Sequence, residues 1–361
     1  MDFSHSPAPP RRDGIALVIV LLVVVALGIL AGGFSYSMLV ETRLARNANM
    51  EPDLEWLGRS GVELARYVLG HTLSIPGESG IASLNQKWAG GPGMTNDILS
   101  EINLSDVPLG NGSFSVKIVD CERKVNINIA SEDLLQRAFV FMGVDAAVQS
   151  SVIEAILDWK DLDDNPRLNG AESEEYLRGN PPYYSKNGPL DDIAELMMIR
   201  GITPELFWGH EGARQNPRSL QETVSSGSPG LGQTYSGVGL SELFTTFGTP
   251  QININTASLA VLQLLPGVDA NIAGAIMQRR AGYDGAEGTE DDQPFRSVVE
   301  LAGIAGLGPQ YVALIQRFCG VMSATFEVTV EAKMSPYRRR FKALVRRANA
   351  RDVAILHFGW E

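Results

Sequence analysis

The residues between 158 and 175 include the densest group of side chains that could bind a metal ion. When Asp161 is counted as the first position of a twelve-residue loop, acidic and amide groups fall where an EF-hand places its ligands for a hard cation. The positions counted in this way are Asp161, Asp163, Asn165, the carbonyl of Arg167, Asn169 and Glu172. Position six, normally glycine, is Pro166, so the loop cannot turn as an EF-hand does, and Gly170 could supply the flexibility instead. The alternative is an acidic loop that is solvated and binds no ion.

A second acidic loop, D-G-A-E-G-T-E-D-D, covers Asp284 to Asp292. It could also bind a cation, but acidic loops rich in glycine are common without metal. We therefore favour a solvated loop at this place.

Nothing in the sequence predicts catalysis. The four histidines stand at positions 5, 71, 210 and 357, without metal-ligand spacing. Neither a G-x-S-x-G elbow nor a phosphate-binding G-x-x-x-x-G-K-[ST] loop is present. We expect a protein that is not an enzyme.

The N-terminal segment predicts a membrane anchor that follows a short leader. Residues 15–34 are apolar and uncharged. At about 1.5 Å per residue, such a helix spans roughly the 30 Å hydrocarbon core. Arg11 and Arg12 place the leader in the cytoplasm, although Arg43 and Arg46 on the other flank weaken that assignment. The bulk of the chain would then lie outside the cytoplasm.

The start of the anchor is similar to a substrate of prepilin peptidases. These enzymes cut after the glycine that ends a basic leader and methylate the new amine, which here means cleavage after Gly14 and methylation of Ile15. An ordinary single-pass anchor is the alternative.

The helix is expected to continue beyond the membrane, because apolar residues recur at roughly helical spacing up to Leu69. In pilin-like filaments the fifth residue of the mature helix is usually a glutamate, which pairs with the N-terminal ammonium of the subunit ahead. Here that position is Ile19. A subunit without this carboxylate cannot hold a neighbour ahead of it, so the tip is where its loss costs least.

With these features the chain resembles the K-type minor pseudopilins of type II secretion systems, the GspK family. Three further features carry the resemblance: E-T-R-L-A-R at 41–46, the acidic segment from Asp158 to Glu172, and a long helical insertion before the final strands. The resemblance implies an α+β fold, in which a pilin-like N-terminal helix and an antiparallel sheet surround a large all-helical insertion of two helix-hairpin-helix or SAM-like units.

The resemblance also implies a function. It implies a subunit that prepilin peptidase processes, that sits at the tip of the periplasmic pseudopilus and that helps to initiate its assembly. Its partners would be the I- and J-type minor pseudopilins, and its location the inner membrane, with a single span and the C-terminal bulk in the periplasm.

Family members bind calcium with the acidic segment, so the resemblance implies Ca²⁺ here. The implied ligands are Asp161, Asp163 and Glu172, with Asn165, Glu174 and Glu175 as weaker candidates.

The expected organisation follows from these assignments and from the strand and helix patterns. We expect strands at 114–119, 125–129, 325–333 and 337–346, and helices that include 146–159 and 271–280. The expected parts are a leader at 1–14, a transmembrane helix at 15–36, the pilin helix and first strands at 37–128, a helical insertion with the acidic loop at 129–248, a second helical unit at 249–320 and closing strands at 321–361. The motifs V-N-I-N-I-A-S at 125–131 and I-N-I-N-T-A-S at 252–258 indicate that the insertion holds two copies of one helical module.

A DNA-binding protein of an uptake system is the alternative function. Residues 252–308 look like tandem helix-hairpin-helix units, whose G-x-G turns bind phosphate at a helix N-terminus. However, Asp269 replaces a second glycine in the first turn, and Gly306-Leu307-Gly308 has no basic residue after it until Arg317. The net charge of −12 also disfavours nucleic acid as a main partner. We favour a compact helical domain that is used for protein contacts.

The chain has two cysteines, Cys121 and Cys319, each beside a predicted strand. If those strands are neighbours, the sulfurs could form one disulfide in an oxidising periplasm. Two free buried thiols are the equal alternative.

Overall fold

The computed structural model describes residues 13–93, 98–209 and 237–361. Arg11 and Arg12 of the leader, and the loop residues 210–236, lie outside the described residues.

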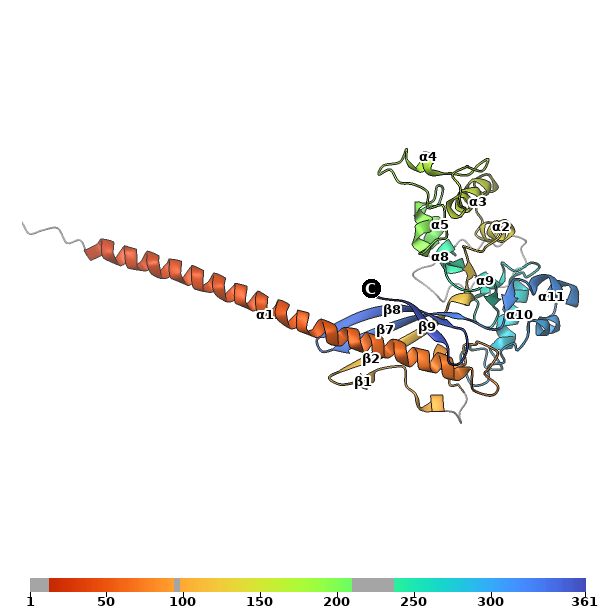
Figure 1. Cartoon of the computed structure of the whole chain (residues 1–361), viewed down its shortest axis with the longest axis horizontal. Coiled ribbons are helices and arrows are strands. Elements are labelled where there is room, and N and C mark those ends of the chain that lie inside the picture. The colour runs from red at the N-terminus through yellow and green to blue at the C-terminus, as the bar shows by residue number, and fades with distance from the viewer. Residues whose placement is uncertain (1–12, 94–97, 210–236) are drawn as a thin grey trace, which may run out of the picture.

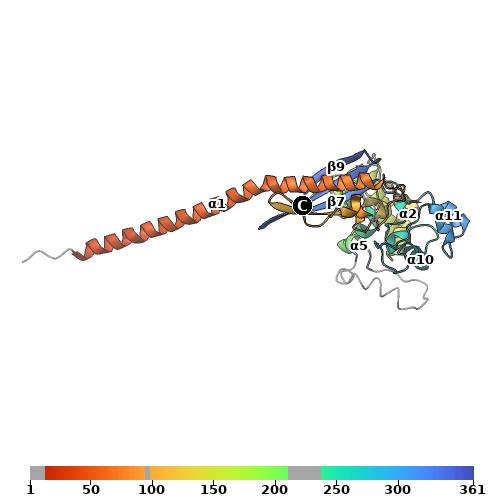
Figure 2. The same ribbon diagram turned by 90° about the horizontal axis from the view of Figure 1, so that it is seen from below.

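The helix α1, Asp13–Thr72, is 60 residues long and has two different halves. In the first half, large apolar side chains from Leu17 to Leu44 are exposed, and the ribbon projects far from the rest of the molecule (Figures 1 and 2). In the second half, residues such as Leu57 and Leu69 are buried against the sheet. Within the described part of the chain, α1 is the one helix long and apolar enough to cross a membrane.

An antiparallel five-stranded sheet with the order β1-β2-β7-β8-β9 packs against the second half of α1 (Figure 1). The strands are β1 Val107–Leu109, β2 Gly112–Asp120, β7 Thr325–Met334, β8 Tyr337–Arg347 and β9 Val353–Trp360. Alternate residues of β2 and β7 point inward, and Val116 pairs with Val330 in the register of these strands. This period-two pattern buries one face under α1 and leaves the other polar.

The insertion connects β2 to β7 and lies beyond the end of the sheet that is remote from the projecting half of α1 (Figure 1). It is mostly helical, and the expectation of an all-helical insertion was wrong only in that its described part also holds four two-residue strands, β3 to β6. Its helices are α2 Glu132–Phe141, α3 Ala146–Lys160, α4 Ser173–Tyr176, η4 Ile193–Met198, α5 Pro204–Trp208, α8 Leu240–Leu243, α9 Leu259–Leu262, α10 Ala270–Arg280, η5 Val298–Gly303 and α11 Pro309–Ile315. Three further 3₁₀ turns lie outside these helices: η1 Lys87–Ala89, η2 Ile98–Glu101 and η3 Cys121–Arg123. This architecture confirms the expected α+β fold class.

Two short parallel ladders close the two halves of the insertion. β3 Val125–Asn126 pairs with β4 Phe244–Thr245, and β5 Ile252–Asn253 pairs with β6 Cys319–Gly320. We call residues 125–245 the first helical unit and residues 252–320 the second.

Several expected elements differ from the structure. The strand expected at 125–129 ends after Asn126, because the Asn126 side chain accepts a hydrogen bond from the N–H of Asn128 (3.0 Å) and turns the chain. β1 and β9 were not predicted. The helices expected at 146–159 and 271–280 are present as α3 and α10.

Both cysteines are buried and free. β2 and β7 are neighbours, as the disulfide hypothesis required, but Cys121 lies in η3 and Cys319 in β6. Burial raises the pKa of both thiols, that of Cys319 to about 12. In this structure the two thiols are therefore free, as one of the two alternatives expected. A disulfide in the oxidised protein stays a prediction.

A buried polar cluster joins the sheet to the second helical unit. The Asp120 carboxylate at the end of β2 is 2% exposed and accepts hydrogen bonds from Asn253 Nδ2 (3.1 Å), the Ser323 hydroxyl (2.6 Å) and the Thr256 hydroxyl. Glu122 accepts the backbone N–H groups of Thr249 and Thr325. Because buried carboxylates need such donors, these bonds fix the place of the insertion on the sheet.

Glycines allow α1 to lie close to the sheet. A Cβ atom added at Gly61 would come within 2.5 Å of Val330 Cγ1, and one at Gly58 within 2.4 Å of the Phe341 ring. The helix therefore contacts the strands at a distance that no side chain at these positions would permit.

We expect Gly61→Ala to destabilise the protein by about 1–3 kcal/mol through overpacking, despite the roughly 1 kcal/mol that alanine favours a helix. Denaturant unfolding of the detergent-solubilised chain measures this effect. The matched control is Gly274→Ala in α10, where an added Cβ meets nothing within 4 Å, and we expect it to be neutral or stabilising. Equal stability of both variants would contradict the close packing.

Candidate functional site

The acidic loop begins where α3 ends, and aromatic residues that contact one another stand on both sides of it in the sequence. Asp145 caps the N-terminus of α3, and Asp161 is its C-terminal cap. Trp159 and Tyr176 are buried with ring centroids 5.3 Å apart, and Tyr183 stacks on Tyr176. The three rings thus pack against one another, with Trp159 just before the loop and Tyr176 just after it.

Two buried carboxylates, Asp158 and Glu172, flank this loop, and Arg167 bridges part of it. Asp158 is fully buried, and Arg167 Nε lies 3.1 Å from its Oδ1. The same guanidinium contacts Asp161 Oδ2 at 3.3 Å. A Cβ at Gly170 would lie 1.8 Å from Asp158 Oδ2. Gly170 therefore provides space for a carboxylate, and its expected role as a source of flexibility stays a prediction.

Some carboxylate oxygens in the loop have no donor. Among the described residues, Asp161 Oδ1 and Glu172 Oε1 are buried without a hydrogen bond, while Glu172 Oε2 accepts from the Ser185 hydroxyl (2.8 Å). Burial raises the pKa of Glu172 to about 7, and the negative charges of Asp158 and Asp161 add to the effect. A cation at this place would relieve both the missing donors and the mutual repulsion.

The other expected ligands lie elsewhere. Asp163 Oδ1 accepts two hydrogen bonds from Asn165, from its backbone N–H (3.0 Å) and its amide (2.7 Å). Glu174 and Glu175 lie on α4 and both pair with Arg178. The negative charge of Asp161 acts on Glu172, whereas Asp163 and Asn165 on the loop and Glu174 and Glu175 on α4 are exposed.

Two acidic groups close to this pair were not counted by the spacing. Asp158 is one, and Asp164, whose negative charge also raises the pKa of Glu172, is the other. Asp158 could have been found from its position beside Trp159 on the buried face of a helix, whereas Asp164 shows no such signal. In the described chain no three His, Cys, Asp or Glu side chains converge closely enough to form a complete metal site.

In the second acidic loop, the carboxylates accept hydrogen bonds from backbone N–H groups of the same loop. Asp291 accepts the backbone N–H groups of Tyr283 (2.6 Å) and Asp284 (3.0 Å), and Asp292 accepts that of Gly288 (2.8 Å). These internal hydrogen bonds agree with the solvated loop that we favoured.

Each helical unit contains a polar turn of the same kind. Asn128 donates to the carbonyl of Leu190 (2.9 Å) and accepts from its N–H (2.7 Å). Asn255 makes the same pair of bonds with Phe295, at 2.9 and 2.8 Å. The repeat that the sequence indicated therefore extends to tertiary contacts.

In each unit a basic residue at the end of a helix donates hydrogen bonds to backbone carbonyls of the polar turn. Lys160 at the end of α3 donates to the carbonyl of Ile127 (2.8 Å), and burial lowers its pKa to about 8. Arg280 at the end of α10 donates to Ile254 (2.6 Å) and Ala257 (2.8 Å). The two acidic loops follow these residues and therefore occupy the same place in the two copies.

Each unit contains two hairpin turns between helices. The turn glycines have left-handed backbone and are Gly143, Gly201, Gly267 and Gly306. Three of the following helices are capped by their own side chains: Asp145 accepts from Ala147 N (2.8 Å), Asp269 accepts from Ile272 N (2.8 Å), and Thr203 caps α5. A phosphate would need these same N–H groups, and two of the caps are anionic. The arrangement disfavours nucleic-acid binding.

Comparisons with known proteins agree with this arrangement. A family model described as "Type II secretion system (T2SS), protein K" matches residues 102–208, which include the acidic loop, and a helix-hairpin-helix model matches residues 249–319. The chain is 26% identical to the putative type II secretion system protein K of Escherichia coli K12, over 55% of this chain and 60% of that protein. It is 24% identical to protein K of Pseudomonas aeruginosa, over 78% and 75%.

A solved structure shares the fold. It is the GspK-GspI-GspJ complex from enterotoxigenic Escherichia coli, with a TM-score of 0.61 and 18% identity, over 88% of this chain and 99% of the matched chain. The chain is thus similar to protein K of type II secretion systems in sequence and in fold. The resemblance drawn from the sequence is thereby confirmed.

The matches to the family differ in extent along the chain. The alignments with the proteins of Escherichia coli K12 and Klebsiella pneumoniae each span 60% of the relative's length. The protein K model ends at residue 208, so the second helical unit is matched by the helix-hairpin-helix model instead.

The raised pKa of Glu172 gives a pH dependence with a definite sign. Because the folded state favours the protonated form, the contribution of Glu172 to stability is complete below its ordinary pKa of 4.5 and is lost as pH rises through about 7. In chelator, wild type should therefore lose stability relative to Glu172→Gln between pH 4.5 and 8. Thermal unfolding of both proteins measures this difference, and Glu122, whose pKa burial also raises to about 7, is present in both and cancels. Parallel pH profiles would contradict the assignment.

Proposed function

We propose that this protein is a minor pseudopilin that prepilin peptidase cleaves between Gly14 and Ile15. In this proposal α1 anchors the subunit in the inner membrane, and the sheet and helical units lie in the periplasm. The observation that carries the proposal is the shape of α1, whose apolar first half is bare while its second half packs into the sheet. Such a helix has a membrane and then a bundle of similar helices as its natural surroundings.

The tip of the pseudopilus is the position that best suits this subunit. Ile19 offers no carboxylate to a subunit ahead, and the two helical units extend beyond the end of the sheet remote from the bare half of α1 (Figure 1). A bulky domain at that end would obstruct a subunit stacked above it. We therefore propose that the protein ends the filament and helps to initiate its assembly.

The proposed partners are I- and J-type minor pseudopilins. The related solved structure is named as a complex of GspK with GspI and GspJ, which supports the same assembly here. We expect no catalytic activity, because the protein K family is a family of structural subunits.

Affinity purification from detergent-solubilised membranes of the native host, followed by intact-mass measurement, tests this function. The expected result is a chain that lacks residues 1–14, carries one methyl group and brings the I- and J-type subunits with it. The control is Gly14→Leu, which should keep its leader. An intact wild-type N-terminus without these partners would refute the proposal, and salt-sensitive binding of duplex DNA to the full chain would favour the uptake alternative that the helix-hairpin-helix match suggests.

We also propose that the acidic loop binds Ca²⁺. Asp161 and Glu172 would hold the ion, with Asp158 and Asp164 close to it, and Asp163, Asn165, Glu174 and Glu175 would contribute only if the exposed part of the loop rearranges. The support is chemical: the donors are hard oxygens, and two of them are buried without a hydrogen-bond partner. When bound, the cation would supply the positive charge that this cluster lacks.

Calcium should raise the melting temperature of wild type, and Glu172→Gln should abolish most of that increase. Affinity should weaken as pH falls below about 7, because a proton on Glu172 competes with the ion. Thermal unfolding and calorimetric titration measure both effects. Glu174→Gln is the matched control, since Glu174 is exposed and pairs with Arg178, and it should respond as wild type does. A normal calcium response in Glu172→Gln would place the ion elsewhere.

A further inference from the structure

Arg167 is the only basic residue in the sequence between Asp161 and Glu172. Its Nε lies 3.1 Å from Asp158 Oδ1, and its Nη2 lies 3.3 Å from Asp161 Oδ2. The backbone N–H of Arg167 also donates a hydrogen bond to Asp158 Oδ2 (3.1 Å). Both the side chain and the backbone of Arg167 thus contact Asp158, and the guanidinium lies between the carboxylates at the start of the acidic loop.

This guanidinium neutralises the acidic loop only in part. It contacts two of the four carboxylates that act on one another here, since the charges of Asp158, Asp161 and Asp164 all raise the pKa of Glu172. Although Arg167 Nε is close to Asp158 Oδ1, that oxygen is one of three in the described loop that are buried without a hydrogen bond. The other two are Asp161 Oδ1 and Glu172 Oε1. A cation that contacts oxygens from all sides would satisfy this group better than a planar fork does.

The guanidinium also keeps Asp158 and Asp161 farther apart than a bound ion would. The two carboxylates contact different nitrogens, at 3.1 and 3.3 Å. In a calcium site, by contrast, every ligand oxygen lies about 2.3–2.6 Å from one central ion. Calcium therefore has to replace the guanidinium before these two carboxylates can share it.

The Arg167 side chain is free to leave, but only if another cation takes its place. It is 45% exposed, and the next residue, Leu168, is 97% exposed, so the guanidinium can turn into water without disturbing the core. A guanidinium does not lose its proton in proteins, and Asp158 is fully buried. Departure of Arg167 alone would leave a buried carboxylate without a counter-ion, which is strongly unfavourable.

We propose that Arg167 is an internal counter-ion of the acidic loop, which calcium displaces when it binds. This inference rests on the calcium site of the proposed function and adds the residue that opposes binding. Without calcium, the guanidinium lies between Asp158 and Asp161. With calcium, it turns to solvent and both carboxylates face the ion. Arg167 thus stabilises the metal-free loop and raises the calcium concentration at which the site fills.

Calorimetric titration of the full chain with CaCl₂ in detergent micelles, at about pH 8 where Glu172 is ionised, tests this competition. We expect Arg167→Gln to bind calcium about tenfold more tightly than wild type, because the ion no longer has to break an ion pair. In chelator the same variant should have a lower melting temperature, because Asp158 has lost its counter-ion. A merely structural role for Arg167 would weaken calcium binding and stability together.

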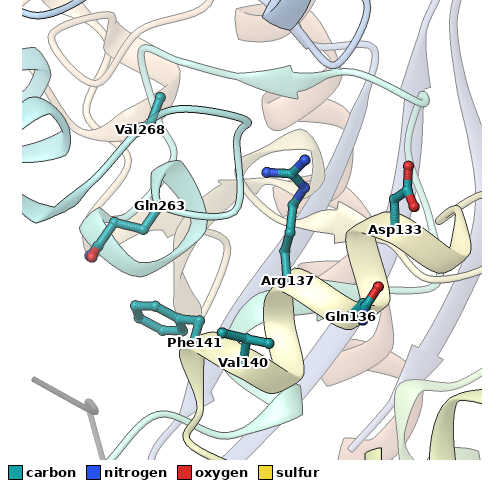
Figure 3. Close-up of a pocket in the computed structure, with 7 residues that line it drawn as sticks. All are labelled: Asp133, Gln136, Arg137, Val140, Phe141, Gln263 and Val268. Atoms are coloured by element: carbon teal, nitrogen blue, oxygen red, sulfur yellow. The ribbon is translucent and has the colours of Figure 1, made fainter. Parts of the chain in front are cut away.

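Two other arginines of the first helical unit provide matched controls. Arg137 projects from α2 into a pocket of about 480 Å³ that is also lined by Gln263 of the second unit (Figure 3). Arg137→Gln therefore removes one positive charge from the same unit without changing the acidic loop. Arg178→Gln removes the arginine that pairs with Glu174 and Glu175 on α4. Both variants should bind calcium as wild type does.

A measurement on the wild-type side chain covers the case in which Arg167→Gln fails to fold. In the chain labelled with ¹⁵N-arginine, the Nε–H signal of Arg167, identified by its loss in Arg167→Lys, should move on calcium saturation toward the signals of exposed arginines. An unmoved signal in the calcium-loaded protein, or unchanged or weaker calcium binding by folded Arg167→Gln, would overturn the inference and leave the calcium site in place. Binding by Arg167→Gln alone would support it, whereas binding by neither protein would remove the site and the inference together.

Discussion

The buried carboxylate of Asp120 is the interaction on which the arrangement of the molecule depends. Asp120 is the last residue of β2. Its carboxylate accepts hydrogen bonds from Asn253 and Thr256 of the second helical unit and from Ser323 in the segment that enters β7. One charged group thus ties together the strand that leaves the sheet, the inserted domain and the strand that returns. Removing any donor would leave a buried charge partly unsatisfied, which proteins tolerate poorly. The insertion is therefore held by specific polar bonds, and two separate apolar cores can meet there without merging.

Duplication explains why so large an insertion can be compact. Each helical unit closes with a two-residue parallel ladder, an asparagine that bonds both backbone groups of a distant residue, and a basic residue that bonds the carbonyls of the turn. The two copies differ in the loops after Lys160 and Arg280, which take no part in the hydrogen bonds of the polar turn. In the first copy some carboxylate oxygens accept no hydrogen bond. In the second copy the carboxylates accept hydrogen bonds from backbone N–H groups of their own loop. The same scaffold can therefore hold a site in one copy and a closed turn in the other.

The sequence predicted what periodicity controls and missed what depends on distant contacts. The strands β2, β7 and β8 alternate clearly, and α3 and α10 show helical spacing, so their positions could be predicted. β9 has no charged residue and does not alternate strictly, and its pairing with β8 is settled only by the assembled sheet. At the acidic loop, counting positions found Asp161 and Glu172 but not Asp158, because an EF-hand count starts after the helix that buries Asp158. The space that Gly170 leaves for Asp158 is a tertiary contact, which no local pattern records.

Pro52 lies inside α1, between the bare half of the helix and the half that the sheet covers. Proline removes one backbone hydrogen bond and clashes with the preceding turn, and α1 changes direction along its length in Figure 2. The helix thus consists of a projecting arm and a packed arm that meet near Pro52. In the proposed function the projecting arm is the membrane anchor, so the bend sets the angle between the anchor and the globular part. On the packed side the direction of the helix is fixed from Glu51 onward, because Glu51 pairs with Arg339 of β8 at 2.8 Å and Leu54 is already buried in the core.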